Sequence, residues 1–241
     1  MTEPTARDRL IVALDVPTVA EAARLVSTLG DSVTTYKVGL ELLFAGGLNF
    51  ATELKRLGKN VFLDVKLLDI GNTVEAAVAN IAEFGVTFLT VHGTDLKTLR
   101  AAVAGRSPKG PKILAVTVLT NLTADDLKQQ GSTMAPADLV LHRARLAHEA
   151  GCDGVIASGQ EAQRIRDMIG PKFLIVTPGI RLAGGTTDDQ ERVMTPDRAI
   201  TAGADYIVVG RPITRADDPK AAAETFVKHI QQTPKMRGLP N

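Results

Sequence analysis

The sequence predicts a single-domain (β/α)8 barrel, the TIM barrel fold, and three observations lead to this prediction. Eight short apolar runs rich in β-branched residues recur along the 241 residues. Nearly all of them are continuously apolar rather than alternating, as expected for parallel strands that are covered on both faces. Segments with helical spacing lie between the runs, so the chain divides into βα units of roughly 25 residues, as in a barrel of this type.

The eight predicted strands follow one another from the N-terminus to near the C-terminus. They are LIVALD (10–15), TTYKVGL (34–40), NVFLDVKL (60–67), VTFLTVHG (86–93), KILAVTVLT (112–120), DGVIAS (153–158), FLIVTPG (173–179) and ADYIVVG (204–210). The clearest predicted helices between them are 19–30, 73–85 and 136–151, each ending in a glycine, which is a common C-cap.

The domain boundaries follow from what is missing between these elements. A doubly wound sheet remains an alternative at this length, but no Gly-rich dinucleotide-binding turn follows the first predicted strand. No change in composition marks an internal linker, so we expect one domain over 1–241 with a core at about 9–230. The last stretch, QQTPKMRGLPN (231–241), lacks periodicity and is predicted to be a frayed tail.

Composition excludes several classes of function. The 28 basic and 27 acidic residues give a net charge of +1 without a basic stripe, and Trp is absent, so nucleic-acid binding has no support. We find neither a signal peptide nor an apolar run of the roughly 20 residues that would span a membrane. The single cysteine, Cys152, excludes a disulfide within the chain and is expected to be a small buried residue. These features predict a soluble protein of the cytoplasm.

The segment VFLDVKLLDIGNT (61–73) carries three ionisable residues at the end of a predicted buried strand. Asp64 and Lys66 are two positions apart, so their side chains are expected on one face of the strand. Lys37, at the end of the neighbouring strand, could reach Asp64, and Asp69 follows in the loop. An alternating Lys-Asp-Lys-Asp row would keep both lysines protonated in a partly desolvated site and could place an ammonium against a reacting carbon. The alternative is a structural ion-pair network that closes the mouth of the barrel.

A second group of residues is typical of phosphate binding. Gly210 and Arg211 end the last predicted strand just before a helix, where barrels often bind phosphate. The preceding segment, TPGIRLAGGTTDDQERVMTP (177–196), is long and contains three glycines, which suits a lid that closes over a ligand. Together these two segments favour a phosphorylated ligand over a loose surface loop.

Other candidate residues carry weaker signals. His92 ends the fourth predicted strand, where a hydrogen-bonded structural role is equally compatible. Thr120, at the end of the fifth, is a candidate hydrogen-bonding group in the mouth. Ser158 is not surrounded by a nucleophile-elbow motif. No cluster of His, Cys and Asp has the spacing of metal ligands.

With these motifs in place, the chain resembles the orotidine 5'-phosphate decarboxylase family in its bacterial form, from about residue 9 to 230. The most specific motif is Asp64-x-Lys66-x-x-Asp69-Ile70-x-x-Thr73, and LIVALD, YKVG, TVLT, TPGIR and VVGRPI occur around it in matching order. Related Mg²⁺-dependent sugar-phosphate barrels, such as 3-keto-gulonate-6-phosphate decarboxylase and hexulose-phosphate synthase, share D-x-K-x-x-D. Lys37 and the TPGIR segment favour the nucleotide enzyme.

The resemblance implies an activity and the roles of catalytic residues. The reaction would be the loss of CO2 from orotidine 5'-phosphate (OMP) to give UMP, the last step of de novo pyrimidine biosynthesis, without cofactor or metal. Lys66 would donate a proton to C6, and Asp64 would face the substrate carboxylate. Lys37 and Asp15 would hold a ribose hydroxyl and brace Asp64.

The resemblance also implies the remaining substrate contacts. Asp69 and Thr73 would reach into the site of a partner subunit, which implies a homodimer with shared active sites. Thr120 would contact the pyrimidine, and Gln190 would link base and phosphate from the lid. Around the phosphate it places Arg181, Gly210 and Arg211. The alternatives are a Mg²⁺-dependent sugar-phosphate decarboxylase or aldolase of the same barrel group, and a non-catalytic barrel that binds a nucleotide phosphate.

Overall fold

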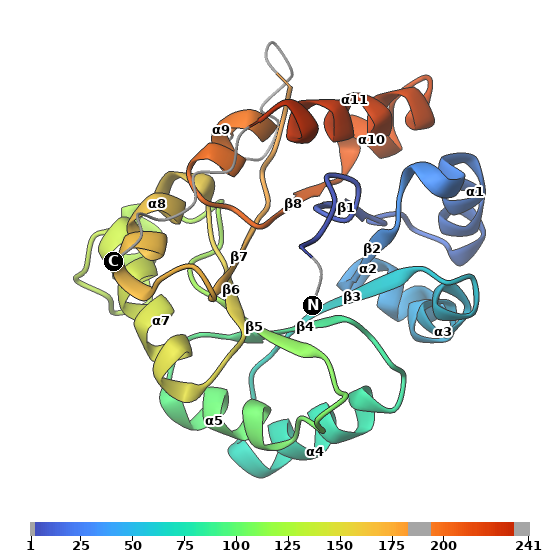
Figure 1. Cartoon of the computed structure of the whole chain (residues 1–241). Helices are drawn as coiled ribbons and strands as arrows, with labels where there is room; N and C mark the ends of the chain where they lie inside the picture. Colours follow the sequence, from blue (N-terminus) through green and yellow to red (C-terminus); the bar gives the residue numbers. More distant parts are fainter. Residues whose placement is uncertain (1–2, 183–193, 234–241) are drawn as a thin grey trace.

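Eight parallel strands close into a barrel in the order of the sequence, with β8 paired to β1. The computed structural model of the chain describes residues 3–182 and 194–233, and Figure 1 shows the barrel approximately along its axis. The strands are β1 (Leu10–Ala13), β2 (Thr35–Gly39), β3 (Asn60–Leu67), β4 (Phe88–His92), β5 (Lys112–Val116), β6 (Gly154–Ile156), β7 (Leu174–Thr177) and β8 (Tyr206–Val209). The predicted (β/α)8 barrel is therefore confirmed. Most strands end before the apolar run does, because the chain leaves the ladder to form the loops at the carboxyl ends.

Helices surround the barrel on the outside (Figure 1). They are α1 (Val19–Leu29), the 3-10 turn η1 (Gly30–Ser32), α2 (Leu40–Leu42), the π-type turn η2 (Leu43–Gly47), α3 (Leu48–Arg56), α4 (Gly71–Ala82), α5 (Leu96–Ala104), α6 (Ala124–Gln129), α7 (Pro136–Ala150), α8 (Gly159–Ile169), α9 (Pro196–Thr201), α10 (Arg211–Thr214) and α11 (Pro219–Gln232). The three helices predicted most clearly are α1, α4 and α7. α11 continues to Gln232, so the first two residues of the predicted frayed tail are helical, and residues 234–241 lie outside the described part.

Local signals in the sequence set the helix ends. The side chain of Thr18 accepts a hydrogen bond from the backbone N–H of Glu21 and so caps the start of α1. α7 begins with Pro136 in its first turn and ends before Gly151, whose φ of 85° is left-handed. Of the three predicted glycine ends, Gly30 and Gly151 are the C-caps of α1 and α7, whereas α4 ends at Ala82, before Gly85.

The interior of the barrel is filled by one apolar cluster, separate from the larger core between strands and helices. The members of the inner cluster are Ile11, Ala13, Phe62, Phe88, Leu114, Val176 and Val208. Phe88 packs edge-on against Phe62 and Tyr206, with ring centroids 6.0 Å and 5.2 Å apart. Aromatic pairs in this geometry add to the stability of apolar burial. These side chains make the interior a packed core.

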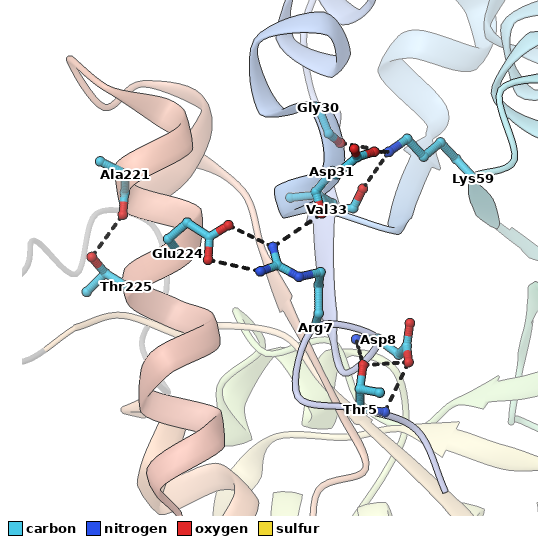
Figure 2. A network of polar contacts seen from close by, with 10 residues as sticks. All are labelled: Thr5, Arg7, Asp8, Gly30, Asp31, Val33, Lys59, Ala221, Glu224 and Thr225. Carbon is cyan, nitrogen blue, oxygen red and sulfur yellow. Dashed lines mark hydrogen bonds and ion pairs between the residues drawn. The ribbon is translucent and has the colours of Figure 1, made fainter. Parts of the chain in front are cut away.

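Polar contacts tie together the amino-terminal end of the barrel, where the strands begin (Figure 2). Arg7, just before β1, binds both carboxylate oxygens of Glu224 on α11, at 2.7 and 3.2 Å, and donates to the backbone carbonyl of Asp31. Lys59, just before β3, donates to the carbonyls of Gly30 and Val33. These bonds hold the N-terminal segment and the start of β3 in place at this end of the barrel. They lie away from the carboxyl ends of the strands.

Across residues 3–182 and 194–233, we find no helix with the length and apolar character needed to traverse a lipid bilayer.

Candidate active site

A cavity of about 460 Å³ opens at the carboxyl ends of the strands. Its lining combines apolar side chains, such as Phe62, Ile156 and Val208, with charged ones. This size and mixed lining are typical of a site for a small molecule. Eight of the residues predicted from the sequence line it: Asp15, Lys37, Asp64, Lys66, Thr120, Arg181, Gly210 and Arg211.

Four of these residues form a continuous row of alternating charge. The Lys37 ammonium lies 2.8 Å from Asp15 Oδ1 and 3.5 Å from Asp64 Oδ2. The Lys66 ammonium lies 2.8 Å from Asp64 Oδ1. Strand order places them together, because Asp15 follows β1, Lys37 is on β2, and the Asp64–Lys66 pair is on β3. Each inner member of the row therefore has an opposite charge on both sides.

The row keeps its charges in spite of burial. Burial alone would lower the pKa of Lys37, but Asp15 and Asp64 outweigh that effect and raise the pKa above its ordinary value. Burial would raise the pKa of Asp64, yet Lys37 and Lys66, with a hydrogen bond from Thr90, hold it below its ordinary value. Both groups are therefore charged at neutral pH, and the site presents fixed charges to a ligand.

The backbone of Lys66 departs from a regular strand. Its φ is +51°. Among the residues that the structure describes, Lys66 is the only non-glycine residue with a positive φ. The register between β3 and β4 shifts between Leu63 and Leu67, as in a β-bulge. A left-handed conformation at a long side chain costs free energy, and such strain concentrates at functional sites. The bulge re-aims the Lys66 side chain at the mouth.

Three arginines line the cavity at the end formed by β7 and β8: Arg181, Arg211 and Arg215. Arg181 is 8% exposed, and its guanidinium donates to the carbonyl of Ile180. The base of the predicted lid is anchored here, because the Arg181 N–H donates to the carbonyl of Met194 and the Met194 N–H donates to that of Gly179. Gln190, together with two of the lid glycines, lies outside the described residues.

Two predicted residues stay away from this cavity in a single chain. The Asp69 side chain is exposed and accepts a hydrogen bond from the N–H of the adjacent Ile70, and no described ion pair joins it to Lys66. Thr73 is exposed in the first turn of α4. The fourth member of the row within one chain is Asp15 rather than Asp69.

The sequence reasoning missed four residues near the site. Glu41, Asn121 and Arg215 line the rim, and Thr90 lies buried behind the row. The rim residues follow strand ends by several positions, so only proximity to the strand ends could have suggested them. Thr90 sits within the apolar run FLTVH, and its polar side chain was a weak indication of a role near the site.

His92, a weaker candidate, ends β4 and does not line the cavity. Burial, with the positive charges of Arg143 and Lys66, lowers its pKa, so the imidazole is neutral at neutral pH. Among the residues that the structure describes, no group of three or more His, Cys, Asp or Glu side chains is placed to hold a metal ion.

Comparison with known proteins gives consistent matches. Residues 8–226 match the family model described as "Orotidine 5'-phosphate decarboxylase / HUMPS family". The chain is 55% identical to the orotidine 5'-phosphate decarboxylase of Afipia carboxidovorans, over 95% of this chain and 97% of that protein. It is also 55% identical to the one from Methylorubrum extorquens, over 93% and 96% of the two chains. The crystal structure of orotidine 5'-phosphate decarboxylase from Lactobacillus acidophilus superimposes with a TM-score of 0.82 at 39% identity, covering 92% of this chain and 99% of the other.

Proposed function

The chain belongs to the orotidine 5'-phosphate decarboxylase / HUMPS family, and from this premise we propose that the cavity at the carboxyl ends of its strands is where OMP loses CO2 to give UMP. The protein is an enzyme that decarboxylates OMP in pyrimidine biosynthesis. The family description also covers a second group, HUMPS, so the description alone does not identify the substrate. The substrate follows from the relatives named orotidine 5'-phosphate decarboxylase, which match this chain at 55% identity over 95% of its length.

One observation carries the assignment of the site: the Asp15–Lys37–Asp64–Lys66 row within the cavity. When the bond between C6 and the carboxylate breaks, CO2 leaves and the electron pair stays on C6. This vinyl-type carbanion has little resonance stabilisation. We assign Lys66 as the group that gives its proton to C6, forming the C6–H bond of UMP and leaving a neutral amine, which solvent reprotonates. A preorganised ammonium stabilises the developing charge before the proton moves.

The other members of the row hold Lys66 and the substrate in place. Asp64 contacts both lysines and is buried, so its carboxylate fixes the position of the Lys66 ammonium. In our proposal Asp64 faces the carboxylate that departs from OMP. Lys37 and Asp15 form a 2.8 Å pair at the outer end of the row, a donor and an acceptor suited to a ribose hydroxyl.

The phosphate of OMP is assigned to the opposite end of the cavity. Arg181, Gly210 and Arg211 line that end, and guanidinium groups bind phosphate through paired N–H donors. Thr120, on the rim after β5, is assigned to the pyrimidine. We further propose that Gln190 links base and phosphate when the lid closes, so that phosphate binding helps to exclude water from the charged row.

We propose that the active unit is a homodimer in which Asp69 and Thr73 complete the partner's site. Both side chains are exposed in one chain, as this role requires. The apolar side chains on either side of Asp69 in the chain are also exposed, with Leu68 56% and Ile70 73% accessible. Such exposure is typical of a surface that a partner covers.

We also place the enzyme in the cytoplasm, since its one thiol, Cys152, is free and buried. Activity confined to a membrane or secreted fraction would contradict this location.

The test of the function is a spectrophotometric assay of OMP loss with the purified protein, with and without EDTA. We expect decarboxylation to UMP that the chelator does not change, because the proposed chemistry uses no metal. Activity that disappears with EDTA and returns with Mg²⁺ would favour the sugar-phosphate group of the family. Tight binding of UMP without turnover of OMP would instead indicate a nucleotide-binding barrel.

A further inference from the structure

Thr90 links Asp64 and Lys66, two neighbouring members of the charged row, through a single hydroxyl group. It lies on β4, next to β3, and its side chain is completely buried. The backbone N–H of Lys66 donates to Thr90 Oγ1 at 3.0 Å, and Thr90 Oγ1 donates to Asp64 Oδ1 at 2.9 Å. The same Asp64 oxygen accepts from the Lys66 ammonium at 2.8 Å. The three bonds therefore close a ring through Lys66, Thr90 and Asp64.

The directions of these bonds are determined by counting protons. A threonine hydroxyl has one proton to donate and lone pairs to accept with. Because a backbone N–H can only donate, Thr90 must accept from Lys66, and its one proton is then available for the Asp64 carboxylate. A carboxylate accepts this proton readily, since hydrogen bonds to charged groups are the stronger ones. The hydroxyl therefore has one favoured orientation.

This ring coincides with the strained part of the backbone. The N–H of Lys66 cannot make a regular ladder bond, because the β3–β4 register shifts between Leu63 and Leu67. Without Thr90 the N–H would be left without an acceptor in a partly buried place, which is costly. Relaxation of Lys66 from its φ of +51° would then change the direction in which its side chain leaves the backbone. Thr90 supplies the bond that the bulge removes.

We propose that Thr90 is a positioning residue, which holds the left-handed backbone of Lys66 and the carboxylate of Asp64 in the arrangement that decarboxylation needs. This inference rests on the proposed role of Lys66 as proton donor. Thr90 lies behind the row and does not line the cavity, so it acts through these two residues without touching the substrate. Its loss should lower kcat more than it weakens nucleotide binding.

The experiment compares Thr90→Val, which keeps the shape but removes the hydroxyl, with Thr90→Ser, which keeps the hydroxyl. For Thr90→Val we expect kcat for OMP to fall by about ten- to a hundredfold, the rate equivalent of one hydrogen bond to a charged group. The Kd for UMP should change by less than about threefold, because the substitution removes no contact between the protein and the nucleotide. Thr90→Ser should stay within about threefold of wild-type kcat, a rescue that a purely steric role would not predict.

Thr98→Val is the matched control. Thr98 is also buried and its hydroxyl also donates to a carboxylate, that of Asp95 at 2.9 Å, but it lies on α5 and does not line the cavity. The same chemical change there should leave kcat unaltered. If Thr90→Val does not fold, Thr90→Cys replaces it, since a thiol is a weaker donor and acceptor of similar size.

A second measurement separates this inference from the assigned function. Hydrogen exchange of the Lys66 amide, followed by NMR without any nucleotide, should accelerate in Thr90→Val and not in Thr90→Ser. If the wild type does not decarboxylate OMP, the proposed function fails, yet the exchange data still test the ring. Wild-type kcat in Thr90→Val, or an unchanged Lys66 exchange rate, would overturn the role of Thr90.

Discussion

The ammonium of Lys66 and the carboxylate of Asp64 lie 2.8 Å apart, although the backbone between them does not continue β3 as a regular strand. In a regular strand these residues would point the same way because they are two positions apart. Here the bulge and the left-handed Lys66 also contribute, and they bend the lysine toward the carboxylate. The pair therefore depends on a specific backbone geometry at Lys66.

Replacement of Lys66 by Ala should remove decarboxylation while preserving the binding of UMP. We expect kcat to fall by at least about a thousandfold, within the range for loss of a general acid. The measurement is OMP turnover together with calorimetric titration of UMP. Lys228→Ala on α11, distant in sequence and outside the cavity, serves as the lysine control. Near-wild-type turnover of Lys66→Ala would contradict its role as proton donor.

Mixing inactive Lys66→Ala and Asp69→Ala proteins should restore activity if sites are shared across a two-fold interface. With random exchange of subunits, half of the dimers are mixed and each has one intact site, so about a quarter of wild-type activity returns. The assay follows OMP loss after exchange, and tagged subunits verify that mixed dimers form. A mixture that stays inactive despite proven exchange would show that Asp69 acts within its own chain.

Gly39→Ala should disturb the charged row without straining the backbone. A Cβ atom at this position would lie 2.8 Å from Lys37 Nζ and 2.9 Å from Asp15 Oδ1, too close for either. The φ of Gly39 is −97°, which alanine adopts freely. Because the row must shift by a fraction of an ångström, we expect kcat/KM to fall by about tenfold or more, with a nearly unchanged melting temperature. Full activity would mean that the row tolerates displacement.

The stabilising effect of Asp64 should depend on pH in the acid range. Burial acts to raise its pKa, but Lys37 and Lys66 hold the pKa below its ordinary value of 3.8. A carboxylate with a lowered pKa stabilises the folded state above its unfolded value, and this contribution is lost as the pH falls through the folded value. The difference in unfolding free energy between wild type and Asp64→Asn should therefore be constant near neutral pH and shrink below 3.8. Urea unfolding at several pH values measures it, and a difference that grows on acidification would contradict the sign.

Arg7→Ala should weaken the fold without affecting catalysis. Arg7 precedes β1 and pairs with Glu224 (Figure 2), and neither residue lines the cavity at the carboxyl ends of the strands. Arg7 and Glu224 are 35% and 44% exposed, so their pair contributes at most about 1 kcal/mol. Glu224→Gln should cost less than Arg7→Ala, which also loses the bond to the carbonyl of Asp31. Thermal unfolding and kcat are measured in parallel, and a large loss of kcat would contradict the separation of the two ends.

Much of the site was predictable because each residue type carries its own signal. Apolar runs are interrupted by Lys37, Asp64 and Lys66. A charged side chain in a buried strand is costly unless it forms an ion pair or takes part in function. Asp15, Gly210 and Arg211 follow strand ends, and strand order alone brings them to one mouth. Thr90 was not predicted, because a threonine inside an apolar run is also an ordinary strand residue. Arg215 was missed since it follows β8 by several residues.

The sequence by itself determined the eight strands, their order and which polar side chains stand at their carboxyl ends. These features depend on local composition and on neighbours along the chain, and parallel strands covered on both faces must be apolar throughout. Only the tertiary structure decided that Asp15 rather than Asp69 completes the row in one chain, that Lys66 is left-handed, and that Thr90 closes a ring with Asp64. Those contacts arise from the register in which β1, β2, β3 and β4 meet when the barrel closes, and no single strand contains that information.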